Sequence, residues 1–258
     1  MQTTFLNQLL ILRFCTLVIV AVGCSSDTGA PIPSTPTATN PSPSIGKKTD
    51  DDTLRAAIDQ YFKTPYDQRF KYTVDGEQLR ATMAKYYADR SAENLKLPTT
   101  IRIDSIRHVT KSSAIAEVFL STQDIPDTYV QCYARKQKEV WLVDWSATNG
   151  WNLMRLNVFQ ATMPSDITTF RVLARIGHYY NYQYRNAQKT HYSIHLSDNY
   201  PGSITGYAEK DTSTGASLFS ILKDGEVHKI VVSIGFTGKE NSLVGISKLV
   251  SDTWFIDE

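Results

Sequence analysis

The chain has 258 residues, of which 41% are hydrophobic and 21% are charged, and its formal net charge is +1. A charge this close to zero provides no electrostatic footprint for nucleic acid or for an anionic membrane surface, so we expect no nucleic-acid partner. No Gly-x-Ser-x-Gly, His-Glu-x-x-His or Gly-x-Gly-x-x-Gly motif occurs, which argues against the enzyme classes that depend on them.

Residues 1 to 23 have the layout of a secretory signal peptide. One basic residue, Arg13, precedes an apolar run that ends in small residues at Gly23. The run is shorter than the about 20 residues that a membrane-spanning helix needs. Without this segment the chain keeps 26 basic and 26 acidic residues, so its surface stays neutral.

Cys24 follows directly on Ala21-Val22-Gly23. This box resembles the lipobox of bacterial lipoproteins, with Ala21 where leucine is usual. The resemblance implies that Cys24 is lipidated, and its acyl chains would contribute about 0.8 kcal/mol per buried methylene to membrane attachment. Ser25 after the cysteine implies an outer-membrane address, facing the periplasm or the exterior. The alternative is an ordinary signal peptide with an incidental cysteine.

Residues 24 to 50 form a Pro/Ser/Thr-rich stretch with five prolines and almost no large apolar side chain. Such a segment cannot bury enough surface to offset the entropy of ordering, so the sequence predicts a disordered tether. If Cys24 is lipidated and Cys15 is removed with the signal, Cys132 is the remaining thiol. It shares the parity of Val130 and Ala134, which predicts a small core residue rather than a nucleophile.

Residues 51 to 152 begin with helical periodicity and change to a period of two. Leu54, Ile58, Tyr61 and Phe62 share a helical face up to Pro65, and a second helix capped near Thr73 or Asp75 carries Leu79, Met83, Tyr86 and Tyr87. Strands are then predicted at Ile101 to Ile103, at Ala114 to Leu120, at Tyr129 to Arg135 and at Glu139 to Trp145, with Asn149-Gly150 closing the unit.

The predicted helices are followed by an antiparallel meander whose last strand is Glu139-Val140-Trp141-Leu142-Val143-Asp144-Trp145. This order of elements resembles the SnoaL-like fold shared with ketosteroid isomerase. The resemblance implies a cone of sheet wrapped on helices. It carries no catalytic residue over, because the isomerase's acid and tyrosine cannot be placed on named positions. Asp104 and Asp144 are the acids on predicted strands of this domain, and either could serve as a general base only if it lay in an apolar cavity.

Residues 165 to 258 show a different order of elements. Alternation of apolar residues is predicted to form one long strand from Val172 to Tyr184, followed by strands at Tyr192 to Leu196 and at Ile204 to Ala208. A short helix over residues 213 to 223 ends near Gly225, and strands at Ile230 to Phe236 and at Leu243 to Val250 complete the region.

Three strands, a helix and two strands resemble an OB-fold, a five-stranded barrel that binds oligonucleotides, oligosaccharides or proteins. The fold class predicted for the whole chain is therefore α+β, with a SnoaL-like cone followed by an OB-like β-barrel that contains one short helix. The competing architecture is a tandem duplication of the cone, since Trp254 and Phe255 echo Trp141 and Trp145. The position of the helix argues against duplication.

Two apparent motifs have simpler interpretations. His191 and His195 lie four residues apart on a predicted strand, which separates them by about 13 Å, so we expect no shared metal ion. Ser220-Ile221-Leu222-Lys223 and Ser197-Asp198-Asn199 are similar to elements of penicillin-binding enzymes, but their order is reversed and Lys-Thr-Gly is absent. Ser220 and Lys223 are expected on the solvated side of a helix. No metal, cofactor or catalytic residue is predicted.

Residues 178 to 185 hold the densest aromatic cluster, His-Tyr-Tyr-Asn-Tyr-Gln-Tyr-Arg. Tyr180, Tyr182 and Tyr184 continue the parity of Val172 and Ile176, so they are predicted to fill the barrel. The opposite parity then forms an outward face that could stack sugars or bases, and its members are the candidate ligand-binding residues: Tyr179, Asn181, Gln183 and Arg185.

We therefore expect a lipid-anchored envelope protein that acts as a non-enzymatic binding or scaffolding module. Its predicted partners are the membrane, through the lipid at Cys24, and an envelope protein or glycan. The alternative is an isomerase, lyase or hydrolase acting on a small apolar molecule inside the cone.

Overall fold

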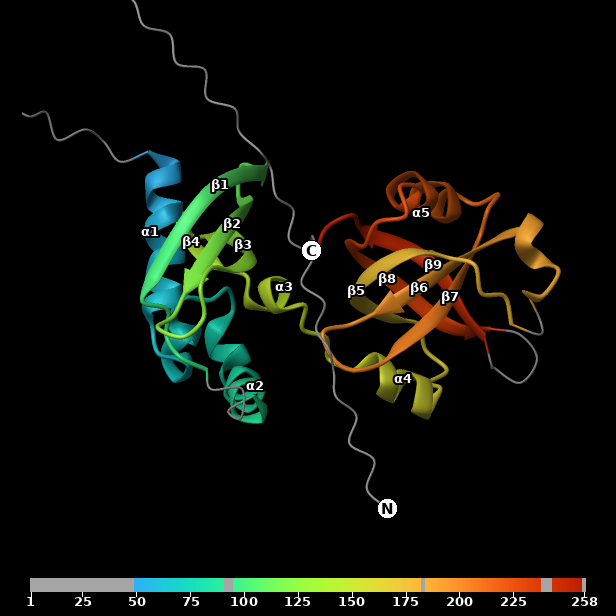
Figure 1. Cartoon of the computed structure of the whole chain (residues 1–258), viewed down its shortest axis with the longest axis horizontal. Helices are drawn as coiled ribbons and strands as arrows, with labels where there is room; N and C mark the ends of the chain where they lie inside the picture. The colour runs from blue at the N-terminus through green and yellow to red at the C-terminus, as the bar shows by residue number, and fades with distance from the viewer. Residues whose placement is uncertain (1–48, 91–94, 182–183, 238–242, 257–258) are drawn as a thin grey trace, which may run out of the picture. The chain divides into compact units, whose positions relative to one another are not determined.

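The structure is a computed structural model that describes residues 49–90, 95–181, 184–237 and 243–256. Residues 47 to 258 form one compact unit of mixed α+β structure with two sheets (Figure 1). The predicted signal peptide, Cys24, almost all of the predicted tether, and Gln183 lie outside the described residues. The boundaries predicted for the individual domains remain predictions.

The first helix, α1 (Asp50–Lys63), is specified by its first turn. The Thr49 hydroxyl accepts a hydrogen bond from the Asp52 amide at 3.2 Å, and the Asp52 carboxylate accepts one from the Thr49 amide at 3.0 Å. Acidic residues in this turn also favour the helix dipole. The helix thus begins at the last residue of the predicted tether, and its buried face is the predicted one: Leu54, Ile58, Tyr61 and Phe62.

A 3-10 helix, η1 (Tyr66–Tyr72), and α2 (Gly76–Asp89) follow. Asp75 occupies the N-cap of α2 in a left-handed conformation, and its side chain makes no capping bond, so the predicted cap lies at the right place without a capping side chain. A Cβ on Gly76 would lie 1.7 Å from the Phe70 carbonyl oxygen, so η1 and α2 can approach this closely only with glycine there.

The first sheet is an antiparallel meander in the order β1-β2-β3-β4. Its strands are β1 (Thr100–Thr110), β2 (Ser113–Ser121), β3 (Thr128–Gln137) and β4 (Val140–Val143). The last strand is shorter than predicted, because the Asp144 carboxylate accepts a hydrogen bond from the Ala147 amide at 2.9 Å and caps α3 (Trp145–Asn149). Gly150, at φ 57°, ends that helix.

The core of this first region, called the cone below, lies between α1, α2 and the sheet. It includes Leu54 of α1, Met83 of α2 and Val118 of β2, all buried. Cys132 is fully buried in the same cluster, as its parity predicted. Burial raises the pKa of its thiol to about 12, so the group stays protonated and unreactive at neutral pH.

The second sheet closes into a five-stranded barrel in the order β5-β6-β7-β9-β8. Its strands are β5 (Thr168–Gly177), β6 (His191–Ser197), β7 (Ser203–Glu209), β8 (His228–Thr237) and β9 (Leu243–Ser251). All of its pairs are antiparallel except β7 with β9. A 3-10 turn, η4 (Ala187–Lys189), precedes β6, and α5 (Ser213–Leu222) connects β7 to β8, the predicted position of the helix.

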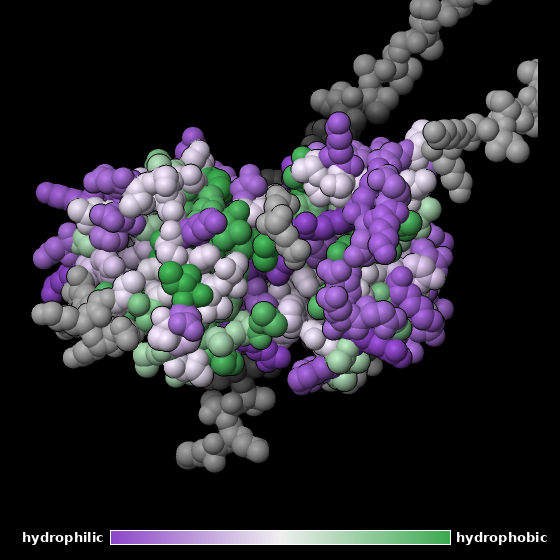
Figure 2. All heavy atoms as spheres, turned by 180° about the vertical axis from the view of Figure 1, so that it is seen from behind, coloured by the Kyte–Doolittle hydropathy of each residue, from purple (hydrophilic) through white to green (hydrophobic). Residues whose placement is uncertain are grey.

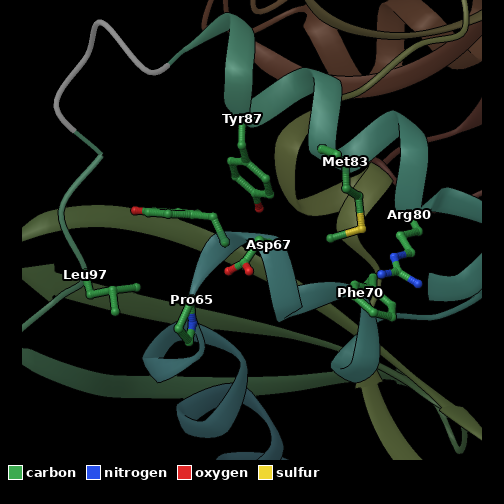
Figure 3. A pocket seen from close by; sticks show the side chains of 9 residues that line it. Pro65, Asp67, Phe70, Arg80, Met83, Tyr87 and Leu97 are labelled. Atoms are coloured by element: carbon green, nitrogen blue, oxygen red, sulfur yellow. The ribbon is translucent and has the colours of Figure 1, made fainter.

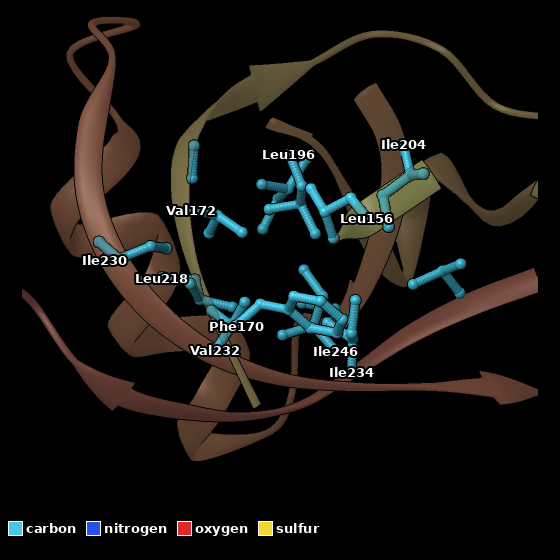
Figure 4. Packing of buried hydrophobic residues seen from close by; sticks show 14 of the residues in the cluster. Leu156, Phe170, Val172, Leu196, Ile204, Leu218, Ile230, Val232, Ile234 and Ile246 are labelled. Atoms are coloured by element: carbon cyan, nitrogen blue, oxygen red, sulfur yellow. The ribbon is translucent and has the colours of Figure 1, made fainter. Parts of the chain in front are cut away.

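The barrel interior is filled by hydrocarbon side chains that point toward one another from all five strands (Figure 4). Two of its fully buried members, Leu156 and Phe159, come from α4 (Leu156–Thr162). This helix lies between the two predicted domains, residues 51 to 152 and 165 to 258. It is fixed by the Asp198 carboxylate, which accepts a hydrogen bond from the Leu156 amide at 2.9 Å.

The end of the chain after β9 contacts both the barrel and the cone sheet, and the Trp254 Nε1 donates to the Val172 carbonyl of β5 at 3.0 Å. Trp254 and Phe255 join a cluster with Ile115 and Tyr133 of that sheet, and the ring centroids of Tyr133 and Phe255 lie 4.9 Å apart. The second region therefore differs from the first in strand order and in the role of its final aromatic residues, which does not support a duplication.

Candidate functional site

The strand predicted from Val172 to Tyr184 is shorter in the structure, and the aromatic stretch that follows β5 is not part of it. The last pair of the β5–β6 ladder is Gly177 with Ser193, and β5 ends there. Parity therefore no longer decides which side chains face outward, and the assignment of Tyr180 and Tyr184 to the barrel interior is wrong. Tyr182 lies outside the described residues.

Tyr180 and Tyr184 instead cover the outer side of β7. The Tyr184 ring stacks on that of Tyr207 with centroids 4.1 Å apart, and its edge meets His191 at 4.8 Å. The Tyr180 hydroxyl donates a hydrogen bond to the His191 carbonyl at 3.1 Å. These rings contact one another, so they pack within the protein and are not free to bind a ligand.

Two of the candidate residues, Tyr179 and Asn181, lie beside this cluster and are held through their backbones. The Ser193 hydroxyl donates to the Tyr179 carbonyl at 2.6 Å, and the Asn181 amide donates to the Tyr207 hydroxyl at 3.1 Å. The Tyr179 side chain itself is 65% exposed. A fixed backbone with a free ring is a geometry suited to stacking on a ligand.

Tyr179 stands between two hollows on the outside of the barrel, which also share Thr205. One hollow, of about 570 Å³, includes Ser193 and His195 of β6. The other, of about 480 Å³, includes Asn181 and Tyr207. Together they form what we call the barrel groove. Arg185 is exposed but lines neither hollow, and Gln183 lies outside the described residues, so Tyr179 and Asn181 are the candidate residues that the structure places in the groove.

The groove combines neutral hydrogen-bonding groups with the charged side chains of Arg175, Lys223 and Asp224. Burial, and then the nearby Arg175, lower the pKa of His195, so the imidazole is neutral at physiological pH and both donates and accepts. Asp224 lies at one end, and its carboxylate is 2.9 Å from the His228 Nε2. The hydroxyl, amide and neutral imidazole groups beside the free ring can pair with the hydroxyl groups of a polar ligand.

Sequence reasoning missed Ser193, His195 and Thr205 as groove residues. The alternation in β6 already placed His191, Ser193 and His195 on one face, opposite Ile194 and Leu196. Within the described residues, no group of three or more His, Cys, Asp or Glu side chains is arranged to hold a metal ion.

The other candidate motifs occupy structural positions. Ser220 and Lys223 are exposed at the end of α5. Asp198, of the second motif, accepts hydrogen bonds from the amides of Leu156 and Tyr200. The structure thus uses the Asp198 carboxylate to join two backbone segments.

The two strand acids of the cone are also engaged by protein groups. Asp104 is exposed, and its Oδ2 lies 2.6 Å from the Arg102 Nη1. Asp144 caps α3 and lies 3.0 Å from the Arg135 Nε. Neither lines one of the described hollows, so neither is placed to act as a base on a ligand there.

On the face seen in Figure 2, small patches of hydrophobic side chains alternate with polar ones. In the part of the chain that the structure describes, no helix is long and apolar enough to cross a bilayer.

No protein-family model matches the chain, and no curated protein matches it. One solved structure is similar to part of it, a protein described as a "putative NTF2-like transpeptidase" from Campylobacter jejuni. The likeness has 14% identity and a TM-score of 0.27, and it covers 37% of this chain and 97% of that one. At this TM-score the likeness carries no argument about the fold or the function of this chain.

Proposed function

We propose that this protein is a lipid-anchored component of a bacterial envelope. It acts as a binding module that recognises an uncharged envelope glycan in the barrel groove. The observation that carries the proposal is the exposed Tyr179 ring, 65% accessible, on a backbone held by Ser193 and Tyr207. The hydroxyl and imidazole groups beside it match the hydroxyl-rich, neutral surface of a sugar.

The anchor part of the proposal rests on the sequence. The lipobox-like Ala21-Val22-Gly23-Cys24 and the proline-rich segment after it support a lipid at Cys24 with the folded part held away from the membrane. Ser25 supports an outer-membrane address.

The proposed fold assignments are a SnoaL-like cone and an OB-like barrel. The helices that precede a four-stranded meander support the first. The strand order β5-β6-β7-β9-β8, the parallel β7–β9 pair and α5 between β7 and β8 support the second. An OB-like barrel offers the outer face of its second and third strands to oligosaccharides, and those strands here are β6 and β7.

Binding is tested by co-sedimentation of the purified full-length protein with isolated cell-wall sacculi and by titration with soluble fragments of their glycan. We expect Tyr179→Ala to weaken binding about ten-fold or more, because it removes the free ring, and to change the free energy of unfolding by less than about 0.5 kcal/mol. Tyr129→Ala is the matched control, since Tyr129 is 49% exposed on the cone sheet.

Equal binding by Tyr179→Ala, Tyr129→Ala and the unchanged protein would show that the groove is not the glycan site. The anchor is tested separately by Cys24→Ala with metabolic labelling by a fatty acid. We expect the label to disappear and the protein to remain unprocessed or leave the membrane fraction. Retained labelling would disprove the lipid at Cys24.

A further inference from the structure

Arg69 of η1 is the most unusual charged residue of the described part of the chain, because only 5% of its surface is accessible. Arginine is rarely buried to this extent without an acidic partner. Its Nε donates to the Thr64 carbonyl at 3.1 Å, and its Nη2 donates to the Phe62 carbonyl at 3.0 Å. The guanidinium group is also hydrogen-bonded to the side chains of Tyr66 and Tyr87. All of these partners are neutral, so none of them balances the positive charge.

No carboxylate among the described residues lies within ion-pair distance of Arg69. Aromatic rings surround the cation instead. The guanidinium carbon lies 4.1 Å from the ring centroid of Tyr66, 4.9 Å from that of Tyr61 and 5.9 Å from that of Tyr87. Rings stabilise a cation but do not neutralise it, so the positive charge remains available to an anion.

The tyrosine hydroxyls around Arg69 are fixed. The Trp145 Nε1 donates to the Tyr87 hydroxyl at 3.1 Å, and the hydroxyls of Tyr61 and Tyr87 lie 3.3 Å apart. Burial raises the pKa of Tyr61 and Tyr66, so neither becomes an anion that could balance Arg69 at neutral pH. The cage is therefore preorganised and keeps a net positive charge.

Arg69 and Tyr66 of η1 line a hollow of about 530 Å³. The apolar part of its lining includes Leu120 of β2 and Ile125 of the β2–β3 connection. Lys96 and Asp124, also in the lining, pair with each other, so this ion pair does not supply an anion to Arg69. The hollow thus combines an apolar wall with one unneutralised cation at its inner side.

A neighbouring hollow holds an arginine in a different environment from that of Arg69. It shares Tyr66 and has a volume of about 590 Å³, and in it Tyr87 and Met83 reach from α2 toward Asp67 and Phe70 of η1 (Figure 3). Its cation, Arg80, is exposed and lies over the Phe70 ring at 4.6 Å. Because Arg80 is exposed, water solvates its charge, whereas the charge of Arg69 is buried.

From these observations we propose that the cone contains a second binding site, in which Arg69 takes the carboxylate of a ligand whose apolar body lies against Leu120 and Ile125. A carboxylate matches the planar fork of a guanidinium and makes strong charge-assisted hydrogen bonds with it. The ligand is a small free acid or the carboxyl end of an apolar peptide, which share this chemistry. The site is separate from the barrel groove and does not depend on the glycan proposal.

The site is tested by calorimetric titration of the full-length protein in detergent at neutral pH. The probes are hexanoate against hexanamide, and N-acetyl-Ala-Leu against its C-terminal amide. We expect at least one of the acids to bind about ten-fold or more tightly than its amide, because the amide lacks the charge. The acid that binds identifies the source of the carboxylate. Equal binding of both acids and their amides, or no binding, would overturn the proposal.

Arg69→Met should abolish the preference for the acid, whereas the matched control Arg80→Met should keep it, since Arg80 lines only the neighbouring hollow. If Arg69→Met does not fold, Ile125→Glu and Ile125→Gln give the same information. Ile125 is 57% exposed, so both variants should fold. We expect Glu to weaken acid binding several-fold more than Gln at low salt and less so at high salt. Equal effects of the two would exclude an electrostatic site.

Discussion

The cone and the barrel are similar in size but differ in how they use their interiors. The buried members of the barrel core are all hydrocarbon side chains, whereas the cone buries tyrosine and tryptophan together with Arg69. A hydrocarbon core stabilises through packing alone, while every buried polar group must find a partner. The barrel therefore keeps its polar binding groups outside, and the cone holds them inside.

The largest expected effect comes from the hydrocarbon core. Phe170→Ala should lower the free energy of unfolding by about 3–5 kcal/mol, because a buried ring is lost and a cavity remains. Phe170 is fully buried, and its ring contacts that of Phe159 with centroids 5.2 Å apart. Denaturant unfolding measures the change. Val227→Ala is the control, since Val227 is 56% exposed and its truncation should cost little.

A smaller effect is expected from a polar position in the cone. Asp144→Ala should cost about 2 kcal/mol, because it removes the cap of α3 and the partner of Arg135. Asp104→Ala serves as the control, and it should change stability by less than about 0.5 kcal/mol because Asp104 is an exposed acid beside Arg102. Similar costs for both variants would contradict the structural role assigned to Asp144.

The hydroxyl network of the cone should contribute less to the free energy of unfolding than Asp144 does. Tyr61→Phe keeps the ring and removes one hydroxyl from the pair with Tyr87, so we expect a loss of about 1 kcal/mol in denaturant unfolding. The reverse change in the barrel, Phe159→Tyr, should cost at least as much, because it places a hydroxyl in a hydrocarbon core. A stabilising Phe159→Tyr would show that the two interiors do not differ as described.

The smallest effect concerns acid stability at the start of the cone. Hydrogen bonds from Lys136 and then Trp141 hold the pKa of Asp50 below its usual 3.8. A lowered pKa stabilises the folded state above pH 3.8, and this contribution is lost as the pH falls through the folded-state value. Asp50→Asn should therefore be less sensitive to pH below about 4 in acid unfolding. Asp51→Asn is the control, and an unchanged acid limb in Asp50→Asn would contradict the assignment.

Elements whose burial follows from local periodicity could be predicted from the sequence. In α1, β6 and α5 the apolar residues recur with the period of a helix or a strand. This spacing predicts the buried face of α1, the inward side of β6 and the position of α5. The end of β5 could not be predicted in this way. The alternation continues to Tyr184, but the strand ends at Gly177, where its pairing with β6 ends. Strand length there is decided by the partner strand.

The sites were harder to predict for the same physical reason. Tyr179 was selected on a parity that does not exist beyond Gly177, and it faces the groove because Ser193 and Tyr207 bind its segment. Arg69 carries no local signal at all. It is buried because rings from α1, η1 and α2 meet around it, and only the tertiary structure brings those rings together.

The packing of Trp254 and Phe255 on Ile115 and Tyr133 has a consequence for the order of folding. A chain is synthesised from its N-terminus, so the cone sheet emerges long before the aromatic residues that cover it. Until those last residues arrive, the nascent cone exposes a hydrophobic face that is a target for chaperones or for aggregation. A stop codon that removes only the final five residues, 254 to 258, would leave both sheets intact in sequence and still produce a chain with this face uncovered.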